Sequence, residues 1–201
     1  ESIRLSVGPS GASATSGRFD LTNFGYVVLL SGGSKTKDNY TLARVLEKKT
    51  RVSIPSATLF HFWNRPVLLE TLARAGVRTR KTVSISQDVA ANFIEESFGL
   101  PVMLNAPRGK RVFVSNEDTL RHVLALFPPG YMVSVQKPVR KAEVHVAFAC
   151  ERGVTGYYRR GDRRTATRLD SSVVSQAKRI REALGADHCL AIFVRMGGRF
   201  Y

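Results

Sequence analysis

The stretch from Tyr131 to Arg160 limits the possible folds of this chain more than any other. It begins with a mainly apolar run at Met132–Gln136, and Glu143–Phe148 then alternates polar and apolar side chains. An alternation with a period of two is typical of a half-buried strand. The segment Glu151–Gly153 predicts a tight turn whose glycine suits a positive φ, and Val154–Tyr158 predicts the returning strand. The stretch therefore predicts three consecutive strands, of which the last two form a hairpin.

The predicted hairpin offers polar side chains on a rigid platform. Glu143 and His145 alternate on its first strand, and Thr155, Tyr157 and Arg159 lie opposite them on the second. The platform follows a strand that ends in a hinge. We therefore expect these polar groups to share one rigid platform.

Length and composition allow one domain or two small lobes, because the chain has 201 residues. A hydrophobic fraction of 43% is enough for a core. No apolar run approaches the roughly twenty residues that a membrane helix needs, and no signal-peptide pattern is present. Glu1 is not a start methionine, so we expect that residues precede it. Cys150 and Cys189 lack metal-ligand spacing, which favours a reducing compartment and no metal site.

The charge of the chain favours a polyanionic partner. Lys and Arg total 31 against 16 acidic residues, a net charge of +15. This balance suits nucleic acid, nucleotide phosphates or an acidic protein surface. We expect the protein to be located in the cytoplasm, or within a virion or another nucleic-acid-rich assembly. Basic residues cluster at Lys48–Arg51, Arg78–Lys81, Arg108–Arg111 and Arg159–Arg164, and each cluster alone is also explained as a solvated surface.

The first part of the chain, residues 1–61, predicts a reduced α/β segment. Ser2–Gly17 is rich in Gly, Ser and Ala and predicts a short strand and a flexible loop. Phe24–Leu30 predicts a buried strand that ends at a Gly-Gly turn. Asn39–Lys48 then predicts a helix with Leu42, Val45 and Leu46 on its inner side.

From Phe62 onward, helices and strands are predicted in alternation. Asn64 is a suitable helix cap and Pro66 fits the first turn, so Asn64–Val77 predicts a helix that Gly76 ends. The later strands are predicted at Arg78–Ile85, Leu100–Leu104, Val112–Val114, Asp187–Val194 and Arg199–Tyr201, and the later helices after Ser86, after Ser115 or Asn116, and at Ser171–Leu184.

This order resembles the ATP-grasp family, in its carboxylate–amine ligase branch of RimK-like and phage amidoligase proteins. The residues that carry the resemblance are Val135-Gln136-Lys137-Pro138-Val139 and Lys141-Ala142-Glu143-Val144-His145-Val146. They follow the family's strand, hinge and hairpin pattern. The resemblance covers residues 62–201 and implies an α+β fold. Two lobes, a smaller one at about 78–135 and the remainder of the core at 136–201, would clasp a nucleotide cleft with antiparallel sheets.

The resemblance also implies a set of site residues and ATP as the ligand. Gln136, Lys137 and Val139 would line an adenine pocket, the last two through the hinge backbone. Glu143, His145 and Arg159 would face ribose and phosphates, and Lys110 would lie over the phosphates. The family's phosphate-covering loop corresponds to Ala106–Arg111, which keeps a single glycine, and an ordinary basic hairpin explains this loop as well.

Three departures from the family pattern bear on catalysis. The acid that binds magnesium corresponds to Ile192, and the family's second acid and asparagine would come just after Tyr201. Leu104 and Asn105 stand where a phosphate-binding cation is expected, and His145 stands in place of an arginine. Magnesium requires oxygen ligands, which isoleucine cannot supply. The sequence therefore argues against a bound magnesium ion.

Two classes of function remain open from the sequence. In the first, the protein is an active, ATP- and magnesium-dependent peptide ligase whose metal ligands lie beyond Tyr201 or on another subunit. In the second, it is a pseudoenzyme: an ATP-grasp scaffold with lost or impaired catalysis and a binding or structural role, whose basic surface would contact nucleic acid or an acidic partner. The departures and the +15 charge favour the second class.

Overall fold

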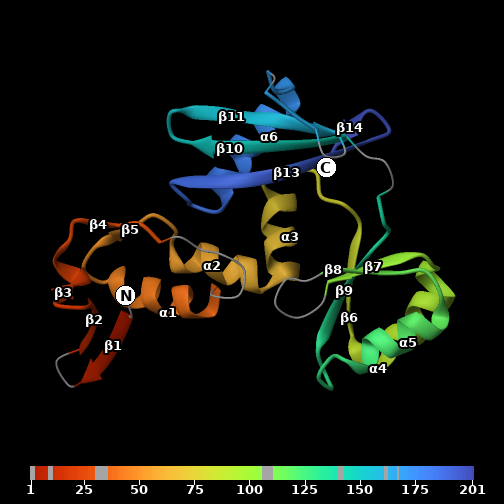
Figure 1. Cartoon of the computed structure of the whole chain (residues 1–201), viewed down its shortest axis with the longest axis horizontal. Coiled ribbons are helices and arrows are strands. Elements are labelled where there is room, and N and C mark those ends of the chain that lie inside the picture. The colour runs from red at the N-terminus through yellow and green to blue at the C-terminus, as the bar shows by residue number, and fades with distance from the viewer. Residues whose placement is uncertain are drawn as a thin grey trace. The chain divides into compact units, whose positions relative to one another are not determined.

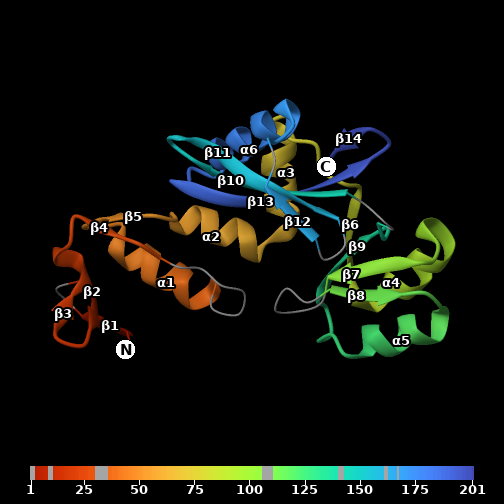
Figure 2. The same cartoon turned by 45° about the horizontal axis from the view of Figure 1, so that its top comes forward.

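The computed structural model describes residues 3–8, 11–29, 36–105, 111–139, 143–160, 163–166 and 168–201. The chain divides into two compact units (Figures 1 and 2), one formed by Glu1–Arg78 with Glu143–Tyr201 and the other by Thr79–Ala142. Each unit contains helices and strands, and its largest sheet is antiparallel throughout. The α+β class predicted from the sequence is therefore confirmed.

The described N-terminal part of the first unit contains short strands, three α-helices and the 3-10 helix η1 (Leu21–Asn23). Strands β1 (Ile3–Gly8), β2 (Gly11–Ser16) and β3 (Phe19–Asp20) form an antiparallel sheet, and β4 (Tyr26–Val27) pairs in parallel with β5 (Arg51–Val52). The helices are α1 (Thr36–Leu46), α2 (Ser56–Trp63) and α3 (Arg65–Arg74). Leu42, Leu46 and Leu59 are buried in the core between α1 and α2, which confirms the predicted helix at Asn39–Lys48.

The prediction of a buried strand at Phe24–Leu30 is wrong within the described residues. Only Tyr26–Val27 is a strand, and Phe24 and Val28 are 47% and 56% exposed. An apolar run becomes a buried strand only where neighbouring elements enclose it. Here the described part of the run pairs with β5 over Tyr26 and Val27, and the residues on either side of this pair stay exposed. The cap predicted at Asn64 is also wrong, because its side chain makes no capping hydrogen bond.

The second unit is a four-stranded sheet with its helices. The strands are β6 (Thr82–Ser86), β7 (Val102–Asn105), β8 (Arg111–Val114) and β9 (Met132–Gln136), in the order β6-β9-β7-β8. Helix α4 (Gln87–Phe93) continues into the π-helical turn Ile94–Phe98, and α5 (Glu117–Ala125) begins after Asn116, whose side chain accepts the Thr119 N–H at 2.9 Å. Ile94, Leu120 and Val135 are fully buried between helices and sheet.

The C-terminal part of the first unit is a five-stranded sheet in the order β12-β11-β10-β13-β14. Its elements are β10 (Glu143–Cys150), β11 (Gly153–Arg160), β12 (Arg163–Ala166), α6 (Ser171–Ala183), β13 (His188–Met196) and β14 (Arg199–Phe200). Gly153 has a φ of +149°, as the turn chemistry predicted. The three consecutive strands predicted between Tyr131 and Arg160 are confirmed as β9, β10 and β11.

Two smaller observations complete the fold. Cys150 and Cys189 are both free thiols, the first half-buried and the second buried. Within the ranges that the structure describes, every helix is too short or too polar to cross a lipid bilayer.

Candidate functional site

The residues expected to form a nucleotide site divide between the two units. Gln136, Lys137 and Val139 belong to the unit Thr79–Ala142, whereas Glu143, His145 and Arg159 belong to the other unit. Lys110 lies outside the described residues.

The five-stranded sheet has two faces of different character, which its register defines. Residues directly paired across antiparallel strands project to the same side. We call the open face the side that carries Val144, Val146, Phe148, Cys150, Thr155, Tyr157, Arg159, His188, Leu190, Ile192, Val194 and Met196. Phe148, Leu190, Ile192 and Met196 on this face are 38%, 64%, 63% and 39% exposed. The open face is thus largely apolar and yet accessible to solvent.

The opposite side, which we call the covered face, lies under helix α6 (Figures 1 and 2). Ala147 and Ala149 of β10 pair with Ala191 and Cys189 of β13, and all four are buried. These small side chains leave room for Val173 and Ala177 of α6, which are fully buried against them. His145 and Phe193 extend the covered face toward β14.

The expectation that Glu143, His145 and Arg159 share one platform is wrong. Arg159 pairs with Val144, so it lies on the open face, one residue out of phase with Glu143 and His145. His145 is on the covered face and is 6% exposed. A strand places successive side chains on opposite sides, so no rotation of a side chain brings these three groups to one ligand-facing surface.

His145 is held inside the first unit by charged and aromatic neighbours. Its Nε2 lies 2.7 Å from Oε1 of Glu143, and Nη1 of Arg195 donates to Oε2 of Glu143 at 3.4 Å. The hydrogen bond with His145 holds the pKa of Glu143 below its ordinary value, and the positive charge of Arg195 acts in the same direction. The His145 ring meets Phe200 edge to face, with centroids 4.7 Å apart. The buried Nδ1 has no hydrogen-bond partner among the described residues.

The position expected to bind magnesium does not fit that ion. Ile192 lies on the open face beside Val146, and its neighbours in sequence, Ala191 and Phe193, are buried on the covered face. A shift of the alignment by one residue therefore also reaches an apolar side chain. Among the described residues, no group of three or more His, Cys, Asp or Glu side chains is placed to hold a metal ion. Magnesium needs oxygen ligands, and these residues supply none.

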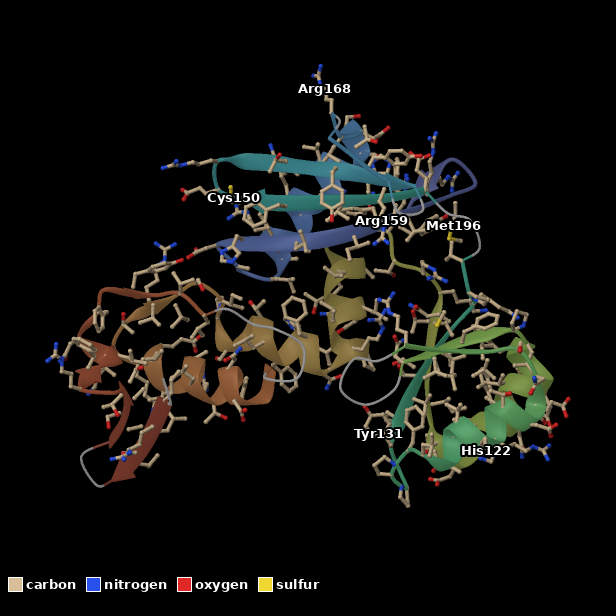
Figure 3. All side chains as sticks on the ribbon, in the orientation of Figure 1. His122, Tyr131, Cys150, Arg159, Arg168 and Met196 are labelled. Carbon is tan, nitrogen blue, oxygen red and sulfur yellow. The ribbon has the colours of Figure 1, made fainter. Side chains whose placement is uncertain are left out.

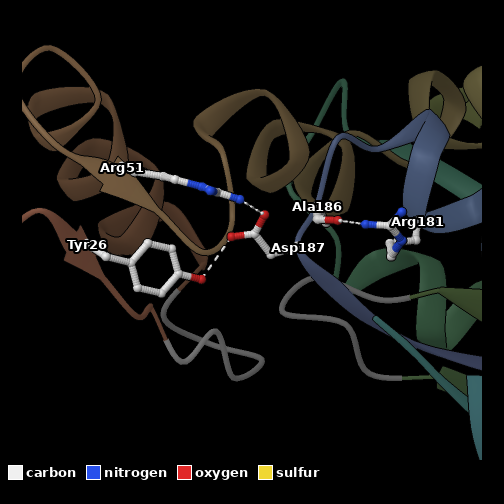
Figure 4. Close-up of polar contacts among 5 residues, drawn as sticks. All are labelled: Tyr26, Arg51, Arg181, Ala186 and Asp187. Carbon is white, nitrogen blue, oxygen red and sulfur yellow. Dashed lines mark hydrogen bonds and ion pairs between the residues drawn. The ribbon is translucent and has the colours of Figure 1, made fainter. Parts of the chain in front are cut away.

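The carboxylate nearest to β13 in sequence is Asp187, and both of its oxygens are engaged (Figure 4). Oδ1 accepts a hydrogen bond from Nη2 of Arg51 at 2.7 Å, and Oδ2 accepts one from the Tyr26 hydroxyl at 2.8 Å. The Arg51 hydrogen bond holds the pKa of Asp187 below its ordinary value. Beside it, Arg181 donates to the Ala186 carbonyl at 3.4 Å. Asp187 thus connects the segment before β13 to β4 and β5.

In the second unit, the hinge residues are engaged by their own neighbours. Gln136 is 4% exposed, and its Nε2 donates to Oγ1 of Thr82 at 2.6 Å. Nζ of Lys137 donates to the Gly99 carbonyl at 2.8 Å, and the Lys137 carbonyl accepts a hydrogen bond from Arg80. Val139 is half-buried. The Gln136 amide and the Lys137 carbonyl, two groups expected at an adenine pocket, therefore already have protein partners.

A groove between β11 and α6 was not predicted from the sequence. Its volume is about 790 Å³, and its lining includes Val154–Gly156, Leu169, Arg168 and Lys178. Figure 3 labels Arg168 near the start of α6. The two sides of the groove, Val154–Gly156 of β11 and Arg168–Lys178 at the start of α6, are separate segments that only the fold brings together, so the sequence gives no signal of a shared groove.

Comparison with known proteins gives matches at the level of structure. No family model matches the chain, and no curated protein matches it. The chain is similar to the RimK-domain ATP-grasp protein of Sphaerobacter thermophilus, with a TM-score of 0.73 and 21% identity over 89% of this chain and 71% of that one. It is also similar to D-alanine–D-alanine ligase of Bacillus anthracis in complex with ATP, with a TM-score of 0.73 and 17% identity over 89% and 65% of the two chains.

A third similar structure is the macrocyclase MdnC of Microcystis aeruginosa bound with its precursor peptide MdnA. Its TM-score is 0.64, and its 13% identity extends over 100% of this chain and 75% of that one. These structures are ATP-grasp ligases, and the chain accordingly has the ATP-grasp fold expected from the sequence. At such low identities, the likeness establishes the fold and leaves the activity open.

Proposed function

We propose that the protein is a relative of the ATP-dependent carboxylate–amine ligases that has lost metal-dependent chemistry and acts by binding. The observation that carries this proposal is the place of Ile192. It lies on the accessible face of the sheet with Val146, Leu190 and Val194 around it. Within the described residues, this face has no carboxylate.

The missing carboxylate matters because of the chemistry of ATP-grasp ligases. Transfer of a phosphoryl group to a carboxylate develops negative charge on oxygens that already carry charge, and magnesium neutralises it and aligns the reacting groups. An apolar surface around Ile192 neither binds the ion nor solvates the phosphates. Asp187 offers no replacement, since Arg51 and Tyr26 already occupy its oxygens.

Two further positions support the same proposal. Leu104 is fully buried where the resemblance expects a phosphate-binding cation, and the neighbouring Asn105 donates to the Ser134 carbonyl at 3.4 Å. His145, which replaces an arginine, is buried on the covered face and paired with Glu143. Neither position leaves a cationic side chain available to a triphosphate.

Isothermal titration calorimetry with ATP, in magnesium and in EDTA, tests the proposal. We expect magnesium to change the affinity for ATP less than twofold. With candidate acceptor peptides, we expect ADP to be released at the background rate measured without the protein. Tight binding that requires magnesium, accompanied by ADP release, would instead support the alternative of an active peptide ligase whose metal ligands are supplied from beyond Tyr201.

A second candidate function is that of a basic structural protein in contact with nucleic acid, which the net charge of +15 favours. Contacts to phosphates make affinity fall steeply with salt. Fluorescence anisotropy with labelled single- and double-stranded DNA at 50 and 200 mM salt tests this function. Six phosphate contacts predict a loss of about a thousandfold between these conditions, independent of base sequence. Absence of binding at 50 mM salt removes this candidate.

A further inference from the structure

The open face carries an apolar strip that extends well beyond Ile192. Leu190, Ile192 and Met196 of β13 are 64%, 63% and 39% exposed, and Phe148 of β10 is 38% exposed. Val144 and Val194 are half-buried and directly paired, so they join the strip across the two strands. These side chains surround Val146, which is buried at 7% exposure, and exposed apolar side chains grouped in this way mark interaction surfaces in soluble proteins.

The dimensions of the strip suit a helix. From Leu190 to Met196 the strand rises about 3.3 Å per residue, so the strip is roughly 20 Å long. A helix of about 13 residues has that length, at a rise of about 1.5 Å per residue. The strip lies on two neighbouring strands, β10 and β13, which are about 4.8 Å apart, and a helix with its side chains is roughly 10 Å in diameter and so covers both of them. The covered face of the same sheet already packs a helix, α6.

The charges of the open face are positive or absent among its described residues. Arg159 is exposed on β11 beside Val144, and the exposed Arg199 of β14 pairs with Met196 and so lies on the same face. In Figure 3, Arg159 lies toward the Met196 end of the sheet, and Cys150 marks the opposite end. Glu143, the acid at the start of β10, is on the covered face with His145 and Arg195.

We propose that the open face docks an amphipathic helix of an acidic partner protein, with an apolar side on the strip and carboxylates on its flanks. This proposal rests on the proposed function, because a face that held magnesium and a triphosphate could not hold such a helix. A second copy of this chain is a poorer occupant, since each copy has a net charge of +15 and the two would repel each other. The apolar strip gives affinity, and the surrounding cations select the sign of the partner's charge.

Three labelled peptides of 18 residues test the proposal by fluorescence anisotropy with the full chain. The first has a leucine strip at helical spacing with glutamates on its flanks. The second replaces each glutamate by lysine, and the third has the composition of the first in a scrambled order. We expect the acidic amphipathic peptide to bind at least tenfold more tightly than either of the others at 100 mM salt.

Variants of the strip distinguish specific binding at this face from nonspecific hydrophobic binding elsewhere on the protein. Leu190→Ser and Met196→Ser each should weaken binding of the acidic amphipathic peptide at least fivefold. Leu126→Ser is a matched control, because Leu126 on the second unit is 77% exposed and lies outside the strip; it should change binding less than twofold. Thermal unfolding of each variant verifies that it is folded.

Failure of this inference is distinguishable from failure of the proposed function. Equal binding of all three peptides, binding of none, or an equal effect of Leu126→Ser overturns the docking surface, whatever the ATP titration gives. Magnesium-dependent ATP binding by the unmodified chain overturns the proposed function, and it is measured without any peptide.

Discussion

The two faces of the five-stranded sheet are made from the same strands, yet they differ in how closely their side chains are packed. The covered face is built from alanines, Cys189 and Phe193, which fit closely against α6. The open face carries larger apolar side chains, of which Leu190 and Ile192 are more than 60% exposed. One face is therefore constrained by packing, whereas the other is free to change its chemistry. A fold can lose a metal site on such a free face without losing its core.

The largest difference in stability between the two faces is expected when the sequence neighbours Phe193 and Ile192 are each replaced by aspartate. Phe193→Asp puts an unpaired charge in a site that is 2% exposed and also leaves a cavity, which costs more than about 4 kcal/mol. Ile192→Asp changes a side chain that is 63% exposed and should cost less than about 1 kcal/mol. Urea unfolding followed by circular dichroism measures both. Equal losses of stability would mean that the register of β13 is shifted, and with it the assignment of Ile192 to the open face.

Gly156 tests how closely the covered face is packed. A Cβ at this position would clash with the Val146 carbonyl oxygen and lie 3.0 Å from Cδ1 of Leu169. Overpacking costs about 1–3 kcal/mol, and a backbone oxygen cannot move aside as a flexible side chain can, so Gly156→Ala should lower stability by at least that amount although alanine suits a strand better than glycine. Thr155→Ala, on the open face of the same strand, is the control and should change stability by less than about 0.5 kcal/mol. A neutral Gly156→Ala would contradict close packing here.

Much of the five-stranded sheet was accessible from the sequence, because its strands alternate and its turns contain glycine. The alternation at Glu143–Phe148 and the glycine at position 153 gave β10, β11 and their turn correctly. The N-terminal strand at Phe24–Leu30 failed because an apolar run does not reveal whether anything encloses it. Short-range sequence patterns thus predict where strands and turns occur better than they predict which strands are enclosed by other elements.

The candidate site was harder to predict than the fold, for a related reason. Glu143 and His145 were placed with Arg159 because all three are polar residues of one hairpin. Which side each faces depends on the register, and a shift of one residue reverses every side chain. His145 alternates with valines in the sequence, yet its ring packs against Phe200 near the C-terminal end, which no local pattern indicates. The register contradicts the shared platform, while the nucleotide-binding roles themselves remain predictions for every residue of the set, which comprises Lys110, Gln136, Lys137, Val139, Glu143, His145 and Arg159.

The carboxylate of Glu143 should stabilise the covered face in a pH-dependent manner. Its folded pKa lies below its ordinary value of 4.5, owing first to the hydrogen bond with His145. Its charge therefore stabilises the fold fully above pH 4.5, and this contribution is lost as the pH falls through the lower folded pKa. Glu143→Gln should cost about 1 kcal/mol or less at pH 7, and nothing at the acid end. Urea unfolding at several pH values measures the difference, and a constant difference across the series would exclude this linkage.

The smallest effect is expected at Asp187, which holds β13 to the N-terminal strands rather than serving either face. Asp187→Asn removes the charge that faces Arg51 while it keeps the shape of the side chain. Because Arg51 is 69% exposed, solvent screens the pair, and the melting temperature should fall by no more than about 2 °C. Arg51→Gln should give a similar fall, and the double variant no further fall, if the two residues act through each other.

The pH dependence of the Asp187 variant has a defined sign. The folded pKa of Asp187 is held below its ordinary value of 3.8 by Arg51, so the pair stabilises the fold above that pH and the stabilisation disappears as the pH falls through the folded pKa. The melting temperatures of the unmodified chain and of Asp187→Asn, measured by differential scanning calorimetry, should therefore become equal as the pH falls below the folded pKa. If Asp187→Asn instead made magnesium-dependent ATP binding disappear, Asp187 would be a metal ligand, and the proposal that the open face has lost its metal chemistry would be wrong.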